Sequence, residues 1–313
     1  MVSETHTLID QLRQNVGQAV FGKRDVVDFC LVALFAGEHV LLEDVPGVGK
    51  TLIGKAIAKS ISADFCRIQF TPDLLPSDIV GSSIFDTQTS EFSFSRGPLF
   101  ANVVLADEIN RTPPRTQSAL LEAMSDAQVT VDGQSYTLPQ PFMVIATQNP
   151  FEFEGTYPLP ESQLDRFLLR ISVGYPERED ERRILESHRH GLPVEELKPV
   201  INRRQILTVQ EETKQVRMDE AIAEYLLEIV EATRKCDELH VGVSTRGALS
   251  LYRAAQALAL LDGRDYVIPD DVKRLCVPVL SHRVVAKAYM HGAQRFAVES
   301  LIHRLIADIR VPR

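Results

Sequence analysis

Short apolar runs alternate with longer helical patterns through residue 175 of the chain. Runs of this length and composition are typical of buried strands. The strand candidates are Val40–Leu42, Cys66–Phe70, Val103–Ala106, Phe142–Thr147 and Leu168–Val173. The helical candidates between them are Asp25–Gly37, Leu52–Ile61, Arg115–Ala127 and Glu161–Phe167. This alternation predicts an α/β fold, with a mainly parallel sheet flanked by helices on both faces.

A break at Gly174-Tyr175-Pro176 ends the alternation, and no strand is expected beyond it. Apolar residues then recur at helical spacing, with Asp219 and Ser244 suited to cap two of the helices. The helices expected there are Arg178–His190, Glu220–Cys236, Thr245–Leu261, Pro269–Ser281 and Ala297–Ile309. We therefore expect two domains, an α/β domain over residues 1–175 and an all-α domain over residues 176–313.

Two hairpin candidates interrupt the α/β region. In residues 129–138 the pair Asp132-Gly133 stands between alternating residues, which is a strong turn signal. A looser pattern joins residues 82–85 to residues 92–95. Both could be plain surface hairpins, but loops on a rigid scaffold often carry function.

Composition excludes several classes of protein. With 44% hydrophobic and 25% charged residues the chain reads as an ordinary globular protein, and its net charge of −9 argues against general affinity for nucleic acid or anionic membranes. The four cysteines are far apart, which favours free thiols in a reducing compartment. No apolar run is long enough to span a bilayer, and the first residues do not read as a signal peptide. We expect a cytoplasmic protein.

Residues 40–51 read VLLEDVPGVGKT, an apolar strand followed by a glycine loop, a lysine and a hydroxyl residue. Gly47 and Gly49 let the backbone turn and bring N–H groups close to an anion. Lys50 can then reach the β- and γ-phosphates of a nucleotide, and the Thr51 hydroxyl can sit on Mg²⁺. The helix that follows, expected from Leu52, adds its N-terminal dipole to the phosphate site.

One position departs from the general phosphate-loop pattern G-x-x-x-x-G-K-[ST]. The pattern places glycine at position 44, where this chain has Asp44. An aspartate is tolerated there if its φ is negative, or if it adopts the left-handed region that Asp accepts better than most residues.

Two acids, Asp107 and Glu108, follow the apolar strand candidate at 103–106. At the carboxyl edge of a parallel sheet they would face the same crevice as the phosphate loop. Asp107 can hold Mg²⁺, directly or through water, and Glu108 can act as the general base on the attacking water. Asn149 ends a third strand and could reach between water and the γ-phosphate, with its neighbour Gln148 as the alternative.

Three arginines are candidates for contact with phosphate. Arg166, in the segment Leu-Asp-Arg-Phe, could act as a finger on the nucleotide of a neighbouring subunit, and Arg170 is its rival. Arg246 lies near an expected helix start, where a cation gains nothing from the helix dipole. A functional role for Arg246 is therefore more attractive than usual.

The chain resembles the AAA+ ATPases, and within them the MoxR group, from about Phe21 to about Leu280. The resemblance depends on five phrases in order: EDVPGVGKT, ADEINRTPPRTQ, ATQNP, LPESQLDRF and VSTRG. It implies a P-loop AAA+ core with a C-terminal helical lid. MoxR-like proteins commonly carry Asp or Gly at the position of Asp44, so that residue does not argue against activity.

The resemblance also implies roles for the motif residues. Lys50 and Thr51 would form Walker A, and Asp107 and Glu108 Walker B. Asn149 would be sensor 1, Arg166 the trans arginine finger and Arg246 sensor 2. The nucleotide-binding residues would be Val20, Phe21 and Gly22 at the adenine, and Asp44, Val45, Pro46, Gly47, Val48, Gly49, Lys50, Thr51 and Leu52 at the phosphates. The two hairpins would be the helix-2 insert and the pre-sensor-1 hairpin.

Family resemblance further implies rings, usually hexamers, with active sites between subunits and chaperone-like action on partners that often carry von Willebrand factor A domains. The main alternative is a motor or loader on nucleic acid. Neither residues 82–95 nor residues 129–140 contain a Lys or Arg for phosphate contacts, so we expect no nucleic acid partner. A nucleotide sensor without turnover is a weaker third hypothesis, because every catalytic acid and arginine is present.

Overall fold

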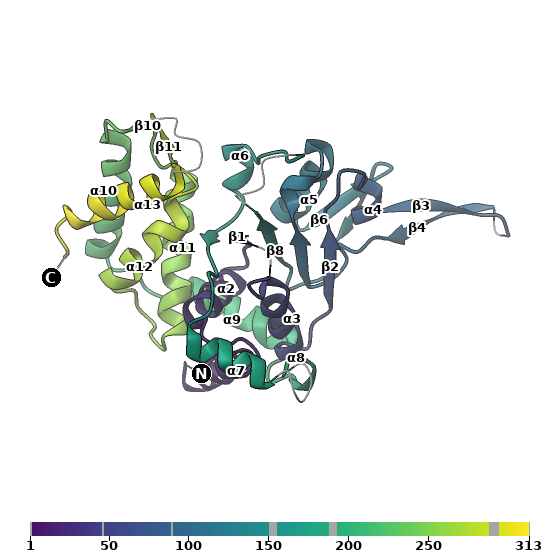
Figure 1. The fold of residues 1–313 in the computed structure, drawn as a ribbon, viewed down its shortest axis with the longest axis horizontal. Coiled ribbons are helices and arrows are strands. Elements are labelled where there is room, and N and C mark those ends of the chain that lie inside the picture. Colours follow the sequence, from purple (N-terminus) through teal and green to yellow (C-terminus); the bar gives the residue numbers. More distant parts are fainter. Residues whose placement is uncertain are drawn as a thin grey trace.

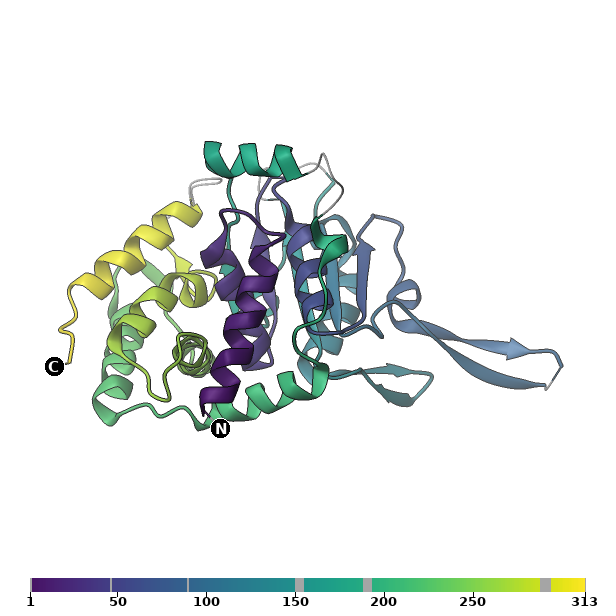
Figure 2. The ribbon, with the colours of Figure 1, turned by 90° about the horizontal axis from the view of Figure 1, so that it is seen from below.

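The computed structural model describes residues 2–45, 47–88, 90–149, 155–187, 193–287 and 294–312. Figure 1 shows an α/β body in the middle, a helical lobe on one side and a long hairpin projecting from the other. The turned view in Figure 2 keeps the same order, so the three parts lie in a row. Pro46 and residues 150–154, which include the end of the ATQNP phrase, lie outside the described residues.

The α/β body contains a five-stranded sheet whose four pairings are all parallel, in the order β2-β5-β8-β1-β9. The predicted strands are confirmed, with ends shifted by at most two residues. Their bounds are β1 Val40–Glu43, β2 Phe65–Gln69, β5 Val103–Asp107, β8 Met143–Gln148 and β9 Leu169–Ile171. All of β1 is buried, as expected for a central strand that is covered on both faces.

Alternate residues of the strands feed two separate hydrophobic clusters. Val40 and Leu42 belong to one cluster, and Leu41 belongs to the other. The helices α1 (Val2–Gly17), α2 (Arg24–Ala36) and α3 (Lys50–Ser60) supply the first cluster, and α5 (Pro114–Asp126) supplies the second. The sheet thus has helices on both faces, as predicted. The helix α1 was not predicted, although Ile9, Leu12 and Val16 are its buried face.

Both predicted hairpins are present and leave the body on the β2 side of the sheet (Figure 1). The larger one follows α4 (Pro76–Val80) and pairs β3 (Gly81–Asp86) with β4 (Glu91–Arg96). The smaller one pairs β6 (Gln128–Val131) with β7 (Gln134–Thr137), and its turn residues Asp132 and Gly133 both have positive φ. Ser83 Oγ donates to Asp132 Oδ2 at 2.6 Å, which links the two hairpins.

The region after residue 176 is mostly helical, with Asp219 and Ser244 capping α10 and α11 as predicted. Its helices are α7 Arg178–Ser187, α8 Pro193–Glu196, α9 Arg203–Gln215, α10 Glu220–Lys235, α11 Thr245–Leu261, α12 Pro269–Leu280 and α13 Gln294–Ala307. The prediction that no strand follows residue 174 is wrong in one detail. An antiparallel pair forms from β10 (Leu239–Val241) and β11 (Val285–Ala286), which are too short to show an alternating pattern.

The first helices after residue 176 pack on the α/β body. Helix α8 contacts α3, α9 contacts α2, and the N–H groups of Val200 and Ile201 donate to Ser60 O. Helix α11 also contacts α2, so one continuous cluster joins both regions. The domain boundary at residues 175 and 176 therefore stays a prediction. Among the helices that the structure describes, none is both long and apolar enough to cross a membrane.

Candidate functional site

The glycine loop between β1 and α3 has the geometry that an anion site needs. Gly47 and Gly49 have φ angles of 87° and 89°, in the region that only glycine adopts without strain. An added Cβ at either position would meet no atom within 4 Å, so the space in front of the loop is open. Helix α3 has no side-chain cap and no acid in its first turn, which leaves its positive end facing that space.

Asp44 fills a structural position beside this loop. Its carboxylate accepts hydrogen bonds from Ser172 Oγ, Gly174 N and Val45 N. Burial raises the pKa of Asp44, but these hydrogen bonds outweigh it and hold the pKa below its ordinary value. Asp44 is not among the described residues that have a positive φ. Its φ is therefore negative, which is the first of the two conditions under which an aspartate is tolerated at this position. Asp44 ties the loop to the segment that leaves β9.

Lys50 is almost fully buried at the start of α3, and its Nζ donates to Asp44 O at 2.9 Å. The lysine is thereby held across the mouth of the loop. An ammonium in that place can move a short way to a phosphate oxygen, where charge-assisted hydrogen bonds are strongest.

A cavity of about 580 Å³ opens in front of the loop. Its lining includes the predicted polar residues Lys50, Thr51, Asp107 and Glu108. It also includes apolar residues, which are Val20, Phe21, Val173, Pro176, Ile184 and Val194. Gly47, Val48, Gly49 and Leu52 of the predicted nucleotide-binding set line it as well, whereas Asp44 and Val45 do not. Polar groups and apolar surface in one cavity suit the phosphates and the base of a nucleotide.

Helix α7 contributes Ile184 to the cavity lining and packs beside Phe21 and Gly22. The Arg183 guanidinium stacks over the Phe21 ring, 5.0 Å from its centre. A Cβ on Gly22, which has a φ of 67°, would meet Asp180 of the same helix at 2.0 Å. Gly22 therefore permits this close packing, and it is absent from the cavity lining.

The two acids lie at the carboxyl end of β5, as predicted, and neighbouring strands hold both of them. Thr147 Oγ1 on β8 donates to Asp107 Oδ1 and accepts from Glu108 N. On β2, Arg67 donates to Asp107 Oδ2 and Gln69 donates to Glu108 Oε2 at 2.8 Å. These three polar residues were not predicted, and the register Gln69↔Asp107 shows that only strand order brings them there.

Glu108 has a backbone conformation that side chains seldom adopt, with φ 58° and ψ 49°. Its carboxylate also lies 3.2 Å from Arg111 Nε. Backbone strain of this kind concentrates at functional positions, because the surrounding structure has to maintain it. The strain is consistent with the predicted role of Glu108 as a base aimed into the cavity.

Two of the predicted alternatives, Gln148 and Arg170, both contact Glu43, and neither Gln148 nor Asn149 lines the first cavity. Gln148 Nε2 donates to Glu43 Oε1 at 2.7 Å, and Arg170 Nε lies 3.7 Å from Glu43 Oε2. The Arg170 side chain is only 11% exposed, so it does not present a cation to a neighbour. Asn149 is buried at the end of β8, one residue past Gln148.

Arg166 and Arg246 line a second cavity of about 630 Å³ that shares no lining residue with the first. Arg166 follows the short helix α6 (Glu161–Leu164), which ends earlier than predicted. Its Nη1 donates to Leu121 O at 2.8 Å and to Ser125 Oγ near the end of α5. Arg246 Nε lies 3.4 Å from Asp165 Oδ2. We call this surface the arginine face.

The donors present fit a magnesium–nucleotide complex better than a protein-only metal cage. Among the described residues, no group of three or more His, Cys, Asp or Glu side chains could hold a metal ion. Mg²⁺ typically takes one or two protein oxygens and completes its shell with water and phosphate. Thr51 and Asp107 line the cavity and have oxygens of this kind.

Comparisons with known proteins agree with this geometry. A family model described as the ATPase family associated with various cellular activities matches residues 39–169, and an AAA lid domain model matches residues 231–302. The chain is 50% identical over 311 residues to the uncharacterized protein YeaC of Bacillus subtilis, covering 99% of this chain and 96% of that protein.

Two further matches extend over the whole chain. The chaperone MoxR1 of Mycobacterium tuberculosis is 42% identical over 322 residues, covering 100% of this chain and 84% of that protein. A crystal structure of an ATPase candidate from Cytophaga hutchinsonii is 36% identical and has a TM-score of 0.90, covering 100% of this chain and 97% of the other. Membership of one family accounts for these matches and for the strand order, the glycine loop and the two acids. The chain belongs to the MoxR group of the AAA+ ATPases.

Proposed function

We propose that copies of this ATPase form a closed ring, a hexamer as in most family members, and hydrolyse Mg²⁺-ATP at the interfaces between them. The energy is used to remodel partner proteins. One observation carries the proposal: the phosphate loop and the arginine face belong to one chain but line separate cavities. An arginine that stabilises the transferred phosphoryl group has to touch it. A neighbouring copy supplies that contact.

Each motif residue has a role in this scheme. Lys50 and the N-terminus of α3 bind the phosphates, Thr51 and Asp107 hold Mg²⁺, and Glu108 activates water. Asn149, buried at the end of β8, orients that water as sensor 1. Arg166 acts as the trans finger and Arg246 as sensor 2, both on the nucleotide of the next subunit. The buried ion pair of Arg170 with Glu43 favours Arg166 over Arg170.

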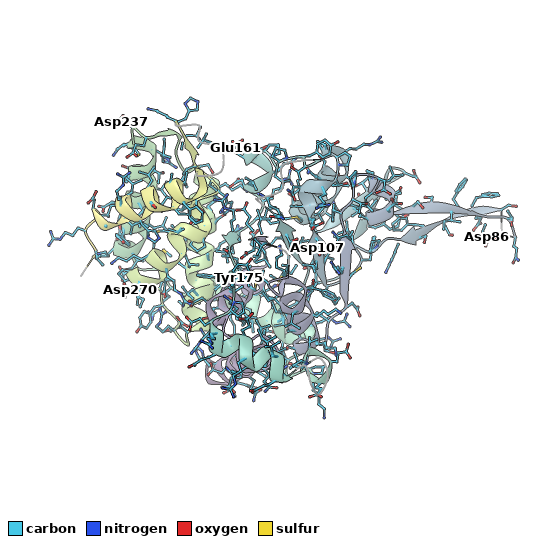
Figure 3. All side chains as sticks on the ribbon, viewed as in Figure 1. Asp86, Asp107, Glu161, Tyr175, Asp237 and Asp270 are labelled. Atoms are coloured by element: carbon cyan, nitrogen blue, oxygen red, sulfur yellow. The ribbon has the colours of Figure 1, made fainter. Side chains whose placement is uncertain are left out.

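The β3–β4 hairpin is the proposed contact with the partner protein. Phe85 and Phe92 pair near its end with ring centres 5.1 Å apart, and they are 49% and 74% exposed. Phe94 and Tyr136, by contrast, stack on each other at 4.0 Å and join the two hairpins. Figure 3 places Asp86 at the far end of the projection, away from Asp107. Exposed aromatic rings with acids beside them suit a polypeptide better than a nucleic acid backbone.

The partner is expected to carry a von Willebrand factor A domain, and the relative named chaperone MoxR1 supports chaperone-like action. We place the protein in the cytoplasm.

The experiment is capture of partners by the Glu108→Gln variant loaded with Mg²⁺-ATP. We expect capture to fall at least severalfold when Phe85 and Phe92 are both changed to Ser, and to persist when the exposed Phe296 on α13 is changed instead.

Equal capture by both variants would exclude the hairpin as the contact. The nucleic-acid alternative makes a different prediction. DNA would then stimulate ATP hydrolysis, and the stimulation would weaken steeply with salt.

A further inference from the structure

Arg67 donates hydrogen bonds to the carboxylate of Asp107, the residue that is proposed to hold the metal. Its Nε and Nη2 both donate to Asp107 Oδ2, at 3.1 and 2.6 Å. The other oxygen, Asp107 Oδ1, accepts from Thr147 Oγ1. The chain itself therefore engages both oxygens of this carboxylate.

The contact between Arg67 and Asp107 can open without repacking the protein. Arg67 belongs to β2, one of the two edge strands of the sheet, and lines the first cavity. Its side chain is 49% exposed, while that of Asp107 is 13% exposed. Because about half of its side chain is exposed, the guanidinium can turn toward solvent while the carboxylate stays in place.

Arg67 and a Mg²⁺ ion bound directly to Asp107 Oδ2 would compete for that oxygen. Mg²⁺ requires oxygen ligands at about 2.0–2.1 Å in near-octahedral order and keeps water on its other positions. A guanidinium nitrogen 2.6 Å from the same oxygen would crowd that shell and repel the ion. Direct coordination of Mg²⁺ by Asp107 therefore favours departure of the guanidinium.

We infer that Arg67 is an internal counter-ion that holds Asp107 while the metal is absent and gives way when Mg²⁺ arrives with nucleotide. The inference rests on the proposed Mg²⁺-ATP function. Arg67 Nη2 also donates to Gln69 Oε1 at 3.0 Å, and Gln69 in turn holds Glu108. Departure of the guanidinium therefore removes one support of the residue that holds the general base.

The first test measures how much Mg²⁺ is needed to tighten binding of a non-hydrolysable ATP analogue, by calorimetry over a range of free Mg²⁺. Arg67→Met removes the charge and keeps the stem, and it should lower the half-saturating Mg²⁺ concentration by about two- to fivefold. Arg67→Glu should lower it further. The control Arg203→Met removes another arginine that is also 49% exposed and paired with an acid, and it should change nothing.

An unchanged or higher half-saturating concentration in Arg67→Met would overturn the inference. Asp107→Asn separates this outcome from failure of the metal site itself. If the wild-type protein and Asp107→Asn both bind the analogue without regard to Mg²⁺, the proposed metal site is wrong. If Asp107→Asn alone loses the Mg²⁺ dependence and Arg67→Met matches the wild type, only the role of Arg67 is wrong.

The second test follows the guanidinium directly. Phenylglyoxal reacts with exposed arginine side chains, and mass spectrometry gives the rate at Arg67. With the ATP analogue bound, addition of Mg²⁺ should accelerate modification of Arg67 and leave that of Arg203 unchanged. A rate at Arg67 that stays the same or falls would show that the guanidinium is not displaced.

Discussion

The two cavities of this chain differ in the groups that line them. The first brings a phosphate loop, two acids and an apolar wall together from residues of one chain. The second brings together two arginines, and their contacts are protein groups: Arg166 with Leu121 O and Ser125 Oγ, and Arg246 with Asp165. The first cavity contains the groups expected of a nucleotide site, whereas the arginine face has cations but no phosphate loop.

In both places protein groups pair with charges that we propose act on nucleotide or metal. Arg67 and Arg111 pair with the acids of the first cavity, and Asp165 pairs with Arg246 on the arginine face. The acids in these pairs are only 13% to 25% exposed, so each would be a poorly compensated charge without its partner. Binding and turnover should therefore be separable, with binding dependent on the first cavity and turnover on both.

The largest expected effect is at Arg166. Arg166→Ala should lower ATP turnover by about 10³-fold or more, as for other arginine fingers, while ATP affinity changes little. Mixing these subunits with Glu108→Gln subunits should restore activity, because about a quarter of the interfaces then combine an intact first cavity with an intact arginine face. Steady-state hydrolysis of the mixtures is the measurement.

Two controls sharpen this mixing experiment. A mixture of Lys50→Ala with Glu108→Gln subunits should stay inactive, because both changes damage the same cavity. Arg304→Ala removes another exposed arginine, which pairs with Glu238, and should keep normal turnover. Absence of rescue in the first mixture would refute the trans role of Arg166.

The second effect concerns binding alone. Lys50→Ala should weaken ATP affinity by about 100-fold, because a charge-assisted contact of a buried ammonium with phosphate contributes about 3 kcal/mol. Calorimetric titration with ATP measures it. Arg246→Ala should leave the same affinity within a few-fold. If the two variants lost affinity equally, the two cavities would not be independent.

A smaller effect is expected at Asp44, which ties the loop of the first cavity to the segment after β9. Asp44→Ala removes the acceptor of three hydrogen bonds and should lower the free energy of unfolding by about 1–3 kcal/mol. Asp44→Asn keeps one acceptor oxygen and should cost less. Urea unfolding of the three proteins gives the order, and equal stability of all three would contradict the structural role.

The smallest effect is a dependence of stability on pH that comes from two buried histidines, His39 and His282. Burial lowers the pKa of His39 in the α/β body. Burial, with the nearby charges of Arg283 and Arg170, lowers the pKa of His282 well below its ordinary value. Val144 N donates to His39 Nδ1 at 3.0 Å, which requires an unprotonated nitrogen.

The sign follows from proton binding. Because both folded pKa values lie below the unfolded value of about 6.5, the unfolded chain binds more protons at lower pH. Stability should therefore be full above about pH 6.5 and fall below it, by up to about 1.4 kcal/mol per pH unit for each histidine. Urea midpoints between pH 7.5 and 5.5 measure the slope. The exposed His303 provides the control, since His303→Gln should leave it unchanged.

Local patterns explain why much of the fold could be predicted. Apolar runs such as Val40–Leu42 and Val103–Ala106 form buried strands. A strand that is covered on both faces buries every side chain of such a run. Helix α9 was missed because its buried face consists only of Ile206, Val209 and Thr213 within a polar sequence. The strands β10 and β11 were missed because two or three residues carry no period.

The glycine loop, the two acids after β5 and the cap residues follow from local sequence, since each depends on neighbours along the chain. The contacts between distant side chains arise only in the folded molecule. Arg67 and Gln69 reach the acids because β2 lies beside β5, and Arg246 joins Arg166 because the helical region packs against the segment before β9. Such contacts depend on strand order and long-range packing, which local spacing does not encode. The same packing buried Arg170 and left Arg166 in the lining of the second cavity.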